Sequence, residues 1–335
     1  MSDKPRSIFE GKGEDEAFPF AQGRRPSPAK GGDRISERDV SSVMNFEGES
    51  GFGSMRFVEA LPGIMVSFNE FRMAGYLSAF ATSRDVLCVD WCKEGRIEQP
   101  MPNGSYAYVS SGDLKIDDRS CHAGRFVFPT SHYCGITVSF DLAKAPGSIR
   151  RALPGFSIDL HDVKRRLCLD GRPLMLRDCR RMGHIASELY DAPARAQRAY
   201  CQIKALEVLL FLDSLDPAFE GKGLPYFPRS RVARVKAARD LMVSDLSADV
   251  TVEKAAQSAS MSLTAFKECF KGIYGASPAA YVRSMRMDMA AKMLRGTDMR
   301  VVDIATSVGY DSPSKFSAAF KAATGLAPSE YRQRR

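Results

Sequence analysis

The feature that most constrains this chain is an internal repeat of 50 residues near its C-terminal end. When residues 252–281 are laid over residues 302–331 without gaps, nine of the 30 positions carry the same amino acid. Self-similarity at a fixed period indicates one structural unit that is used twice. The identical pairs are Val252/Val302, Ala255/Ala305, Ser262/Ser312, Phe266/Phe316, Phe270/Phe320, Lys271/Lys321, Gly275/Gly325, Pro278/Pro328 and Tyr281/Tyr331.

Each unit has the pattern of a helix, a tight turn and a second helix. In the second unit Gly309 favours the turn, because glycine adopts positive φ without strain. Ser312 is placed to cap the next helix and Pro313 suits its first position. Phe316 and Phe320 lie one turn apart, so both are expected to face the core.

The first unit follows the same plan, with Ser262 as cap and with Phe266 and Phe270 as core residues. It has Ala259 where the second unit has Gly309, so its turn is less firmly indicated.

Between the units a longer helix is predicted from Pro278 to Gly296. Roughly 18 residues at about 1.5 Å each span about 27 Å. Such a connector can hold two recognition helices about one DNA turn apart. Arg283 and Arg286 on this helix could contact DNA or pair with acidic side chains.

Charge is distributed unevenly along the chain. From Arg229 to the end there are 18 Lys+Arg and 10 Asp+Glu, whereas the remainder has 30 of each (48 − 18 and 40 − 10). A basic region attached to a neutral one indicates a module that binds a polyanion. The alternative is a basic surface that only aids solubility.

The N-terminal two thirds predict a tail, a strand-rich region, helices and a linker. Residues 1–45 are poor in large apolar side chains and predict a disordered tail. Short alternating runs from about Ser54 to Leu142 are typical of a sandwich or small barrel, and helices are expected from about Asp159. Residues 216–230 contain three prolines and two glycines, which indicates a linker.

A helix predicted over residues 195–215 carries Tyr200, Ile203, Leu206 and Leu210 at helical spacing. It is either a core helix packed on the strands or a dimer interface. The nearby apolar residues that widen this stripe are Leu209, Phe211 and Leu212.

The C-terminal region, about 231–335, resembles the AraC/XylS family of bacterial transcription regulators. The resemblance is carried by DIATSVGYDSPSKFSAAFKAATGLAPSEYR and by YVRSMRMDMAAKML. It implies seven helices, helix-turn-helix units at about 251–272 and 299–322, and recognition helices at about Ser262–Lys271 and Ser312–Lys321. Double-stranded promoter DNA and RNA polymerase are the partners it implies.

The same resemblance implies an N-terminal cupin-like β-barrel, within residues 50–215, that binds a small-molecule effector and is followed by dimerising helices. The stretches RVARVKAARDLMVSDL and KALEVLLFL weakly resemble the siderophore-responsive subgroup. The expected class is thus α+β, with an all-α double helix-turn-helix domain over 231–335. Metal-dependent cupins use His-x-His ligands, and the four histidines form no such pair, so we expect neither an enzyme nor a cofactor.

Positions off the phenylalanine face of each recognition helix are expected to face DNA. Lys267 could donate to guanine edges, Thr264 could reach a base, and Glu268 could accept from cytosine N4. The second helix offers shorter groups and is expected to anchor on phosphates. The complete predicted DNA-binding set is Ser262, Thr264, Lys267, Glu268, Lys271, Ser312, Ser314, Lys315, Ser317 and Lys321.

We therefore predict a cytoplasmic, dimeric, effector-controlled transcription regulator without a membrane span. One alternative is a cysteine-based metal or redox sensor, in which Cys88, Cys92, Cys121 or Cys134 would have to converge with other ligands. Another is a DNA-binding adaptor without a regulatory role. The sequence leaves the effector, the operator and the sign of regulation open.

Overall fold

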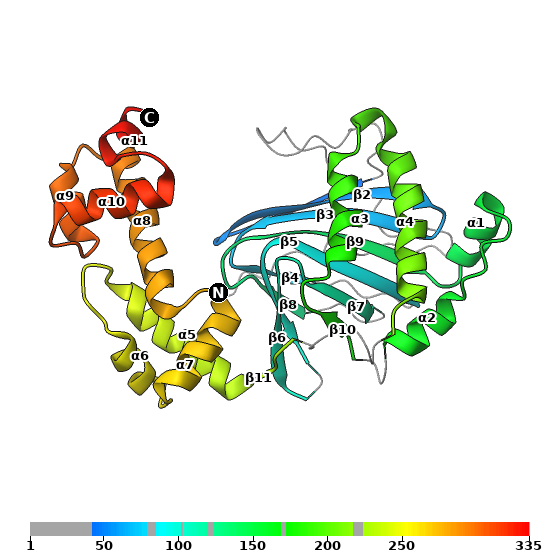
Figure 1. Cartoon of the computed structure of the whole chain (residues 1–335), viewed down its shortest axis with the longest axis horizontal. Helices are drawn as coiled ribbons and strands as arrows, with labels where there is room; N and C mark the ends of the chain where they lie inside the picture. Colours follow the sequence, from blue (N-terminus) through cyan, green and yellow to red (C-terminus); the bar gives the residue numbers. More distant parts are fainter. Residues whose placement is uncertain are drawn as a thin grey trace, which may run out of the picture.

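The computed structural model has an N-terminal part built mainly on strands and a C-terminal part built from helices (Figure 1). The expected α+β class is confirmed. The predicted tail falls almost wholly outside the described residues, and its last part enters strand β1, which begins at Ser42. Within the portion of the chain that is described, no helix is long and apolar enough to cross a membrane. The structure describes residues 42–78, 85–101, 103–119, 124–168, 172–216 and 224–334.

The strands form two antiparallel sheets that share the long strand β5. One sheet has the order β1-β2-β3-β9-β5-β7-β10, and the other has the order β4-β8-β5-β6-β11. The strands are β1 (Ser42–Gly48), β2 (Gly51–Leu61), β3 (Ile64–Arg72), β4 (Gly75–Ser78), β5 (Val86–Pro100), β6 (Ser105–Ser110), β7 (Leu114–Asp118), β8 (Gly124–Val127), β9 (Tyr133–Asp141), β10 (Leu174–Leu176) and β11 (Phe227–Pro228).

Strand β5 passes from one sheet to the other because its pairing with β9 is irregular between Cys92 and Glu94. Such irregularities bend a strand. Gly95 follows with φ 81°, and a Cβ there would lie 2.1 Å from the carbonyl oxygen of His132. The described strands at the ends of the two sheets, β1, β10, β4 and β11, do not pair with one another. Within the described residues the sheets therefore stay open, which corrects the expectation of a cupin-like β-barrel.

Helices α3 (Arg180–Asp191) and α4 (Gln197–Asp213) lie across the first sheet, and α1 (Ala145–Ala152) and α2 (Leu160–Leu167) lie at its edge (Figure 1). Their apolar residues share one core with strands β2, β3, β5 and β9. Asp159 caps α2 by accepting hydrogen bonds from the backbone N–H groups of His161 and Asp162. The helices begin earlier than the expected start at about Asp159, because α1 precedes α2. The proline in the first turn of α1 suits that position.

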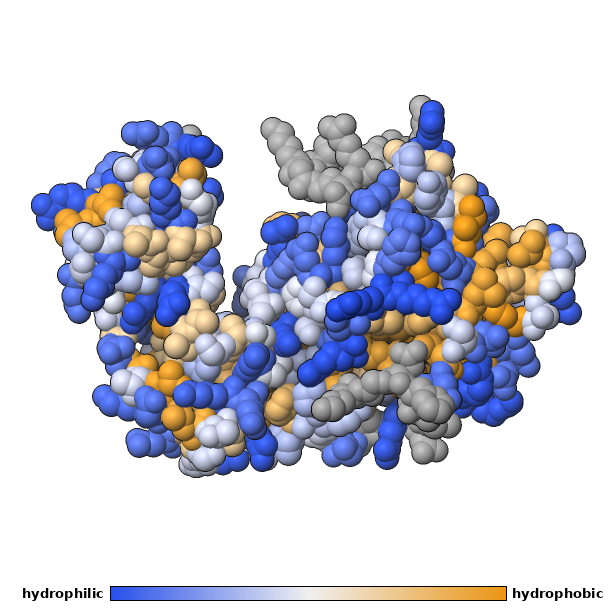
Figure 2. Space-filling view, in the orientation of Figure 1, coloured by the Kyte–Doolittle hydropathy of each residue, from blue (hydrophilic) through white to orange (hydrophobic). Residues whose placement is uncertain are grey.

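Helix α4 uses a different face for its core contacts than the predicted stripe. Its buried side chains include Cys201, Ala205 and Val208, which pack on the sheet. Ile203 and Leu210 of the stripe are exposed. Figure 2 shows apolar surface on this side of the molecule, beside α4 and around α1.

Seven helices follow β11 in the described C-terminal part, as the family resemblance implies. They form two apolar cores, one around the first helix pair and one around the second. An open gap separates the second pair from the N-terminal strands in Figure 2. The helices are α5 (Arg229–Ser244), α6 (Val252–Ser258), α7 (Leu263–Tyr274), α8 (Pro278–Gly296), α9 (Val301–Ser307), α10 (Pro313–Thr324) and α11 (Pro328–Gln333).

Candidate functional site

The first helix-turn-helix unit consists of α6 and α7. The Ser262 hydroxyl caps α7 by accepting from the backbone N–H of Ala265 at 3.3 Å. Phe266 and Phe270 are fully buried in the core below. Gly275 ends α7 in the left-handed conformation, with φ 79°. The cap and the core pair were predicted, and together with the stop at Gly275 they fix the outward face of α7.

That outward face presents the side chains predicted to meet DNA. Thr264, Lys267, Glu268 and Lys271 are exposed, and so is Ser262 at the helix N-terminus. They come from one face of one helix, on the side opposite the phenylalanine pair. The structure therefore brings the first half of the predicted set together.

The second unit, α9 and α10, repeats this geometry. The Ser312 hydroxyl accepts from the backbone N–H of Lys315 at 3.4 Å, and the buried rings of Phe316 and Phe320 anchor the helix. The outward residues of α10 have short side chains apart from its lysines. Ser314, Lys315 and Lys321 are exposed, whereas Ser312 and Ser317 are half-buried.

The two turns differ by one residue. In the second unit the left-handed residue is Gly309, with φ 76°. In the first unit it is Ser260, with φ 50°, one place beyond Ala259, which aligns with Gly309. The first turn is therefore built around a serine that tolerates left-handed φ at some cost.

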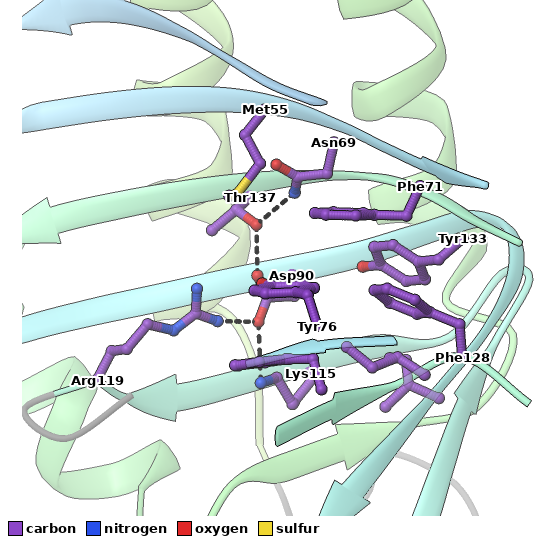
Figure 3. A pocket seen from close by; sticks show the side chains of 13 residues that line it. Met55, Asn69, Phe71, Tyr76, Asp90, Lys115, Arg119, Phe128, Tyr133 and Thr137 are labelled. Carbon is purple, nitrogen blue, oxygen red and sulfur yellow. Dashed lines mark hydrogen bonds and ion pairs between the residues drawn. The ribbon is translucent and has the colours of Figure 1, made fainter. Parts of the chain in front are cut away.

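A small cavity lies between the two sheets of the N-terminal part (Figure 3). Its volume is about 40 Å³, room for only a few water molecules. One end is polar and the other is a wall of aromatic rings. The lining residues are Met55, Asn69, Phe71, Tyr76, Asp90, Ile97, Val109, Lys115, Arg119, Phe126, Phe128, Tyr133 and Thr137.

The polar end is a buried cluster of charges around Asp90. Its carboxylate contacts the Arg119 guanidinium and lies 3.0 Å from Lys115 Nζ, and Lys115 also contacts Asp117 at 2.9 Å. Burial alone would raise the pKa of Asp90, but the charges of Arg119 and Lys115 and the hydrogen bond from Thr137 hold that pKa well below its usual range. The two acids and two bases compensate one another inside the sheet.

Asn69 extends this cluster and leaves one acceptor open. The Thr137 hydroxyl donates to Asp90 at 2.5 Å, so it must accept from Asn69 Nδ2, which lies 3.0 Å away. This fixes the amide orientation, and among the described residues Asn69 Oδ1 has no hydrogen-bond partner although Asn69 is only 5% exposed. Within the same described part of the chain, the Nε of Arg119 has no hydrogen-bond partner either. Buried polar atoms of this kind normally have hydrogen-bond partners. A polar occupant of the cavity could supply them.

The aromatic wall faces this polar end in Figure 3. Phe71 and Tyr76 stack with centroids 5.1 Å apart and planes 7° apart, and Tyr76 stacks in turn on Phe126. Phe128 and Tyr133 form a further stacked pair, with centroids 5.5 Å apart. An occupant of the cavity would therefore meet ring faces on one side and hydrogen-bonding groups on the other.

Three of the candidate cysteines lie on two neighbouring strands, Cys88 and Cys92 on β5 and Cys134 on β9. Cys88 and Cys92 are buried on β5, and burial raises the pKa of Cys88 to about 12 and that of Cys92 further. A raised pKa disfavours the thiolate that metal binding or redox reaction requires. Cys121 and His122 lie outside the described residues. Among those described, no group of three or more His, Cys, Asp or Glu could hold a metal ion.

The C-terminal part matches known DNA-binding proteins. Residues 255–334 match a family model described as a helix-turn-helix domain. The HTH-type transcriptional regulator ExsA of Pseudomonas aeruginosa is 41% identical over 73 residues, which cover 22% of this chain and 26% of that protein. These residues form an AraC-type helix-turn-helix domain.

Two further proteins are similar to a part of this chain. The RCS-specific HTH-type transcriptional activator RclR of Escherichia coli is 42% identical over 84 residues, which cover 25% of this chain and 30% of that protein. The solved C-terminal domain of AraT, a response regulator from Geobacillus stearothermophilus, is 34% identical, with a TM-score of 0.30 over 30% of this chain and 85% of that chain. The matches span less than a third of the length of ExsA and RclR.

Within the AraC-type domain, Arg286 links the two units from the connector α8. Its Nη1 donates to the carbonyl of Gly309 at 3.3 Å and its Nη2 to the carbonyl of Ala248 at 3.2 Å. The first carbonyl belongs to the turn of the second unit, and the second to the loop before α6. Within the described part of the chain, Arg286 thus hydrogen-bonds to carbonyl oxygens and forms no ion pair with an acid, while Arg283 is exposed.

Sequence reasoning missed the linking role of Arg286 and the charged cluster. Two charged residues of opposite sign, Lys115 and Asp117, stand two places apart in the strand LKIDD, and they were a signal for the cluster. Nothing in the sequence distinguishes Arg286 from the exposed arginine three places before it, because carbonyl partners leave no mark in a sequence.

Proposed function

We propose that the whole chain is a transcription regulator that binds promoter DNA through both helix-turn-helix units. The observation that carries the proposal is the pair of capped helices α7 and α10, each with a buried phenylalanine pair and an outward lysine face. In this assignment residues 231–335 bind DNA, 216–230 link, and 50–215 bind an effector and dimerise. The relatives that match are transcription regulators, and we propose no enzymatic activity.

On DNA, we assign sequence reading to α7 and anchoring to α10. Thr264, Lys267 and Glu268 on α7 have the length and chemistry to reach base edges in a major groove. Ser314 and Ser317 on α10 have short side chains, which suit phosphate contacts. The ammonium groups of Lys271, Lys315 and Lys321 also suit phosphate contacts. Ser262 and Ser312, at helix N-termini, lie where phosphates are bound well.

The experiment that tests DNA binding is a titration of a promoter duplex at several salt concentrations. If Lys271, Lys315 and Lys321 each neutralise a phosphate, log K falls against log salt with a slope of about −3. A flat response would remove the electrostatic basis of the proposal. A variant in which Lys271, Lys315 and Lys321 are all replaced by glutamine serves as the reference without these contacts.

We propose that a small-molecule effector binds in the cavity beside Asn69 and Arg119. The open acceptor and the open donor support this, because an occupant with both groups would satisfy them. Since the cavity is small, an effector larger than a few atoms must displace a side chain, and the unbranched Met55 is the lining residue best able to move. The siderophore-responsive resemblance gains no support from these residues.

We further propose that the regulator is a cytoplasmic homodimer and that it acts by recruiting RNA polymerase, as the resemblance implies. The exposed stripe on α4 supports dimerisation. The rival proposal is a cysteine-based metal or redox sensor. Metal analysis of the purified full chain separates the two, because a sensor would carry stoichiometric metal that a chelator removes, or would change its DNA affinity on thiol oxidation.

A further inference from the structure

One strand pair, β5–β6, faces the cavity on one side and the first helix-turn-helix unit on the other. Ile97 pairs with Val109 across the two strands, and Glu98 pairs with Tyr108. Successive side chains on a strand point to opposite faces. Ile97 and Val109 line the cavity, so Glu98 and Tyr108 project from the opposite side.

That opposite side holds a buried polar contact to the helices. Glu98 is 7% exposed, and its carboxylate accepts from the Tyr108 hydroxyl at 2.7 Å and from Lys236 Nζ on α5 at 2.5 Å. Arg96 Nη1 donates to the carbonyl of Gly272, near the end of α7, at 2.9 Å. A buried carboxylate depends on such partners, since removing one leaves an uncompensated charge.

Apolar contacts surround the polar ones. Phe227 pairs with β6 at Tyr106, and its ring lies 6.2 Å from that of Tyr108. A Cβ at Gly272 would lie 2.3 Å from the Phe227 ring, so α7 and β11 are in close contact. Tyr108 and Phe227 belong to the same apolar core as the buried residues of α5, α6 and α7. The core of the second unit includes no residue of the sheet.

We infer that the outward face of β5–β6, defined by Arg96, Glu98 and Tyr108, is a docking surface that holds the first helix-turn-helix unit against the effector cavity. The effector role of the cavity rests on the function proposed above. An occupant that displaces Ile97 or Val109 shifts the strand pair and with it Glu98 and Tyr108. The contact with Lys236 then weakens, and the first unit is released from its fixed orientation.

This docking leaves the recognition surface open. The contacts to the sheet come from Gly272, at the C-terminal end of α7, and from α5, whereas Thr264 and Lys267 on the outward face stay exposed. Docking therefore fixes the orientation of α7 without covering its outward face. An occupant of the cavity would change DNA binding by changing that orientation.

Hydrogen exchange of the full chain tests the docking surface. Glu98→Gln keeps the shape but removes the charge that holds Lys236, so we expect exchange in residues 224–244 to become about tenfold faster. Glu94→Gln is the matched control, because Glu94 is an exposed acid on the same strand. Strands β2 and β3 should keep their protection in both variants. Unchanged exchange in Glu98→Gln, or equal acceleration in Glu94→Gln, would overturn the docking surface.

Transmission from the cavity is tested by filling it. Val109→Phe fills it from the strand pair, and Met55→Phe fills it from β2, which lies outside the docking surface. We expect both to accelerate exchange in residues 224–244, because both crowd the β5–β6 strand pair at Ile97. If Val109→Phe also unfolds β2 and β3, the Met55→Phe variant alone tests transmission. Unchanged exchange in residues 224–244 with a filled cavity overturns transmission. The salt titration judges DNA binding separately, so the two proposals fail by different measurements.

Discussion

Lys267 is the residue for which our proposal makes the sharpest prediction about DNA reading. It is exposed on the outward face of α7. Lys267→Ala should weaken binding to the preferred site by about tenfold and relax base preference at one position, as expected for the loss of a base-edge contact. Binding to a panel of single-base variants of the site would measure this.

Two controls separate base reading from charge. Lys271→Ala removes the same charge from the same helix and should weaken all sites equally, with a smaller salt slope. Ser317→Ala, on α10, should change site preference less than Lys267→Ala. Equal loss of preference in all three variants would contradict the division between a reading helix and an anchoring helix.

Asp90 carries a prediction about pH. Its folded pKa is depressed below the ordinary value of 3.8, so its contribution to stability is present above that value and is lost as pH falls towards the folded pKa. Asp90→Asn breaks a buried ion pair and should lower the free energy of unfolding at neutral pH by about 3 kcal/mol. It should also flatten the loss of stability below about pH 4.

Thermal unfolding between pH 2 and pH 7 checks both effects of Asp90→Asn. Asp85→Asn is the matched control, because Asp85 also pairs with a lysine but its side chain is 45% exposed, and an exposed pair contributes at most about 1 kcal/mol. Equal destabilisation by the two substitutions would mean that the buried cluster is no more important than a surface pair.

At the scale of elements, the C-terminal helices could be predicted well because their signals are local. Ser262 and Ser312 cap, Phe266 and Phe316 are buried, and Gly325 ends α10 in the left-handed conformation. Each of these roles depends on neighbours within a few residues. In the first unit the left-handed residue is Ser260, one place after Ala259, which is the residue that aligns with Gly309 of the second unit.

The strands of the N-terminal part could be predicted from the sequence, but the cavity between the sheets could not. Alternation in the sequence indicates that a strand exists, whereas the place where β5 leaves one sheet for the other depends on partners far along the chain. The helix face of α4 that packs on the sheet was ambiguous for the same reason, since its apolar residues surround much of the helix. Asp90 and Arg119 meet only once β5 and β7 are paired.

The connector α8 gives a prediction about how two elements are held together. Arg286→Lys keeps the charge but cannot reach both the Gly309 and Ala248 carbonyls, so the two units lose a fixed relative orientation. Affinity for a duplex with both subsites should fall by about tenfold, and the penalty for inserting half a helical turn between the subsites should shrink. Arg283→Lys, the same change at an exposed position of α8, should leave both quantities unchanged.

Binding curves on the native and inserted duplexes measure this effect, and unfolding curves show whether the variant is intact. If Arg286→Lys binds both duplexes like the original chain, the arginine is not what fixes the spacing. Gly309→Ala offers a second route to the same joint, because a Cβ there would lie 2.6 Å from the carbonyl oxygen of Leu246.

At the scale of the whole molecule, the exposed stripe on α4 is the surface on which dimerisation is predicted. Tyr200, Ile203 and Leu210 are 36%, 64% and 52% exposed and lie at a spacing of three and seven residues, on one helix face. Single exposed apolar residues are common, but a row at helical spacing on a helix whose opposite face is fully packed indicates a partner. Figure 2 shows that the apolar surface continues from α4 towards α1.

Ile203→Glu places a charge in the middle of this stripe without touching the core, so the monomer should stay folded. The dissociation constant of the dimer should rise by about tenfold or more. Sedimentation over a range of concentrations measures this, and Leu241→Glu, an exposed leucine on α5, is the control. Because each protomer carries its own AraC-type domain, Ile203→Glu should bind a single site normally and lose only the added affinity for paired sites. A dimer that survives Ile203→Glu at unchanged strength would exclude the α4 stripe as the interface and leave the two-unit DNA-binding proposal intact.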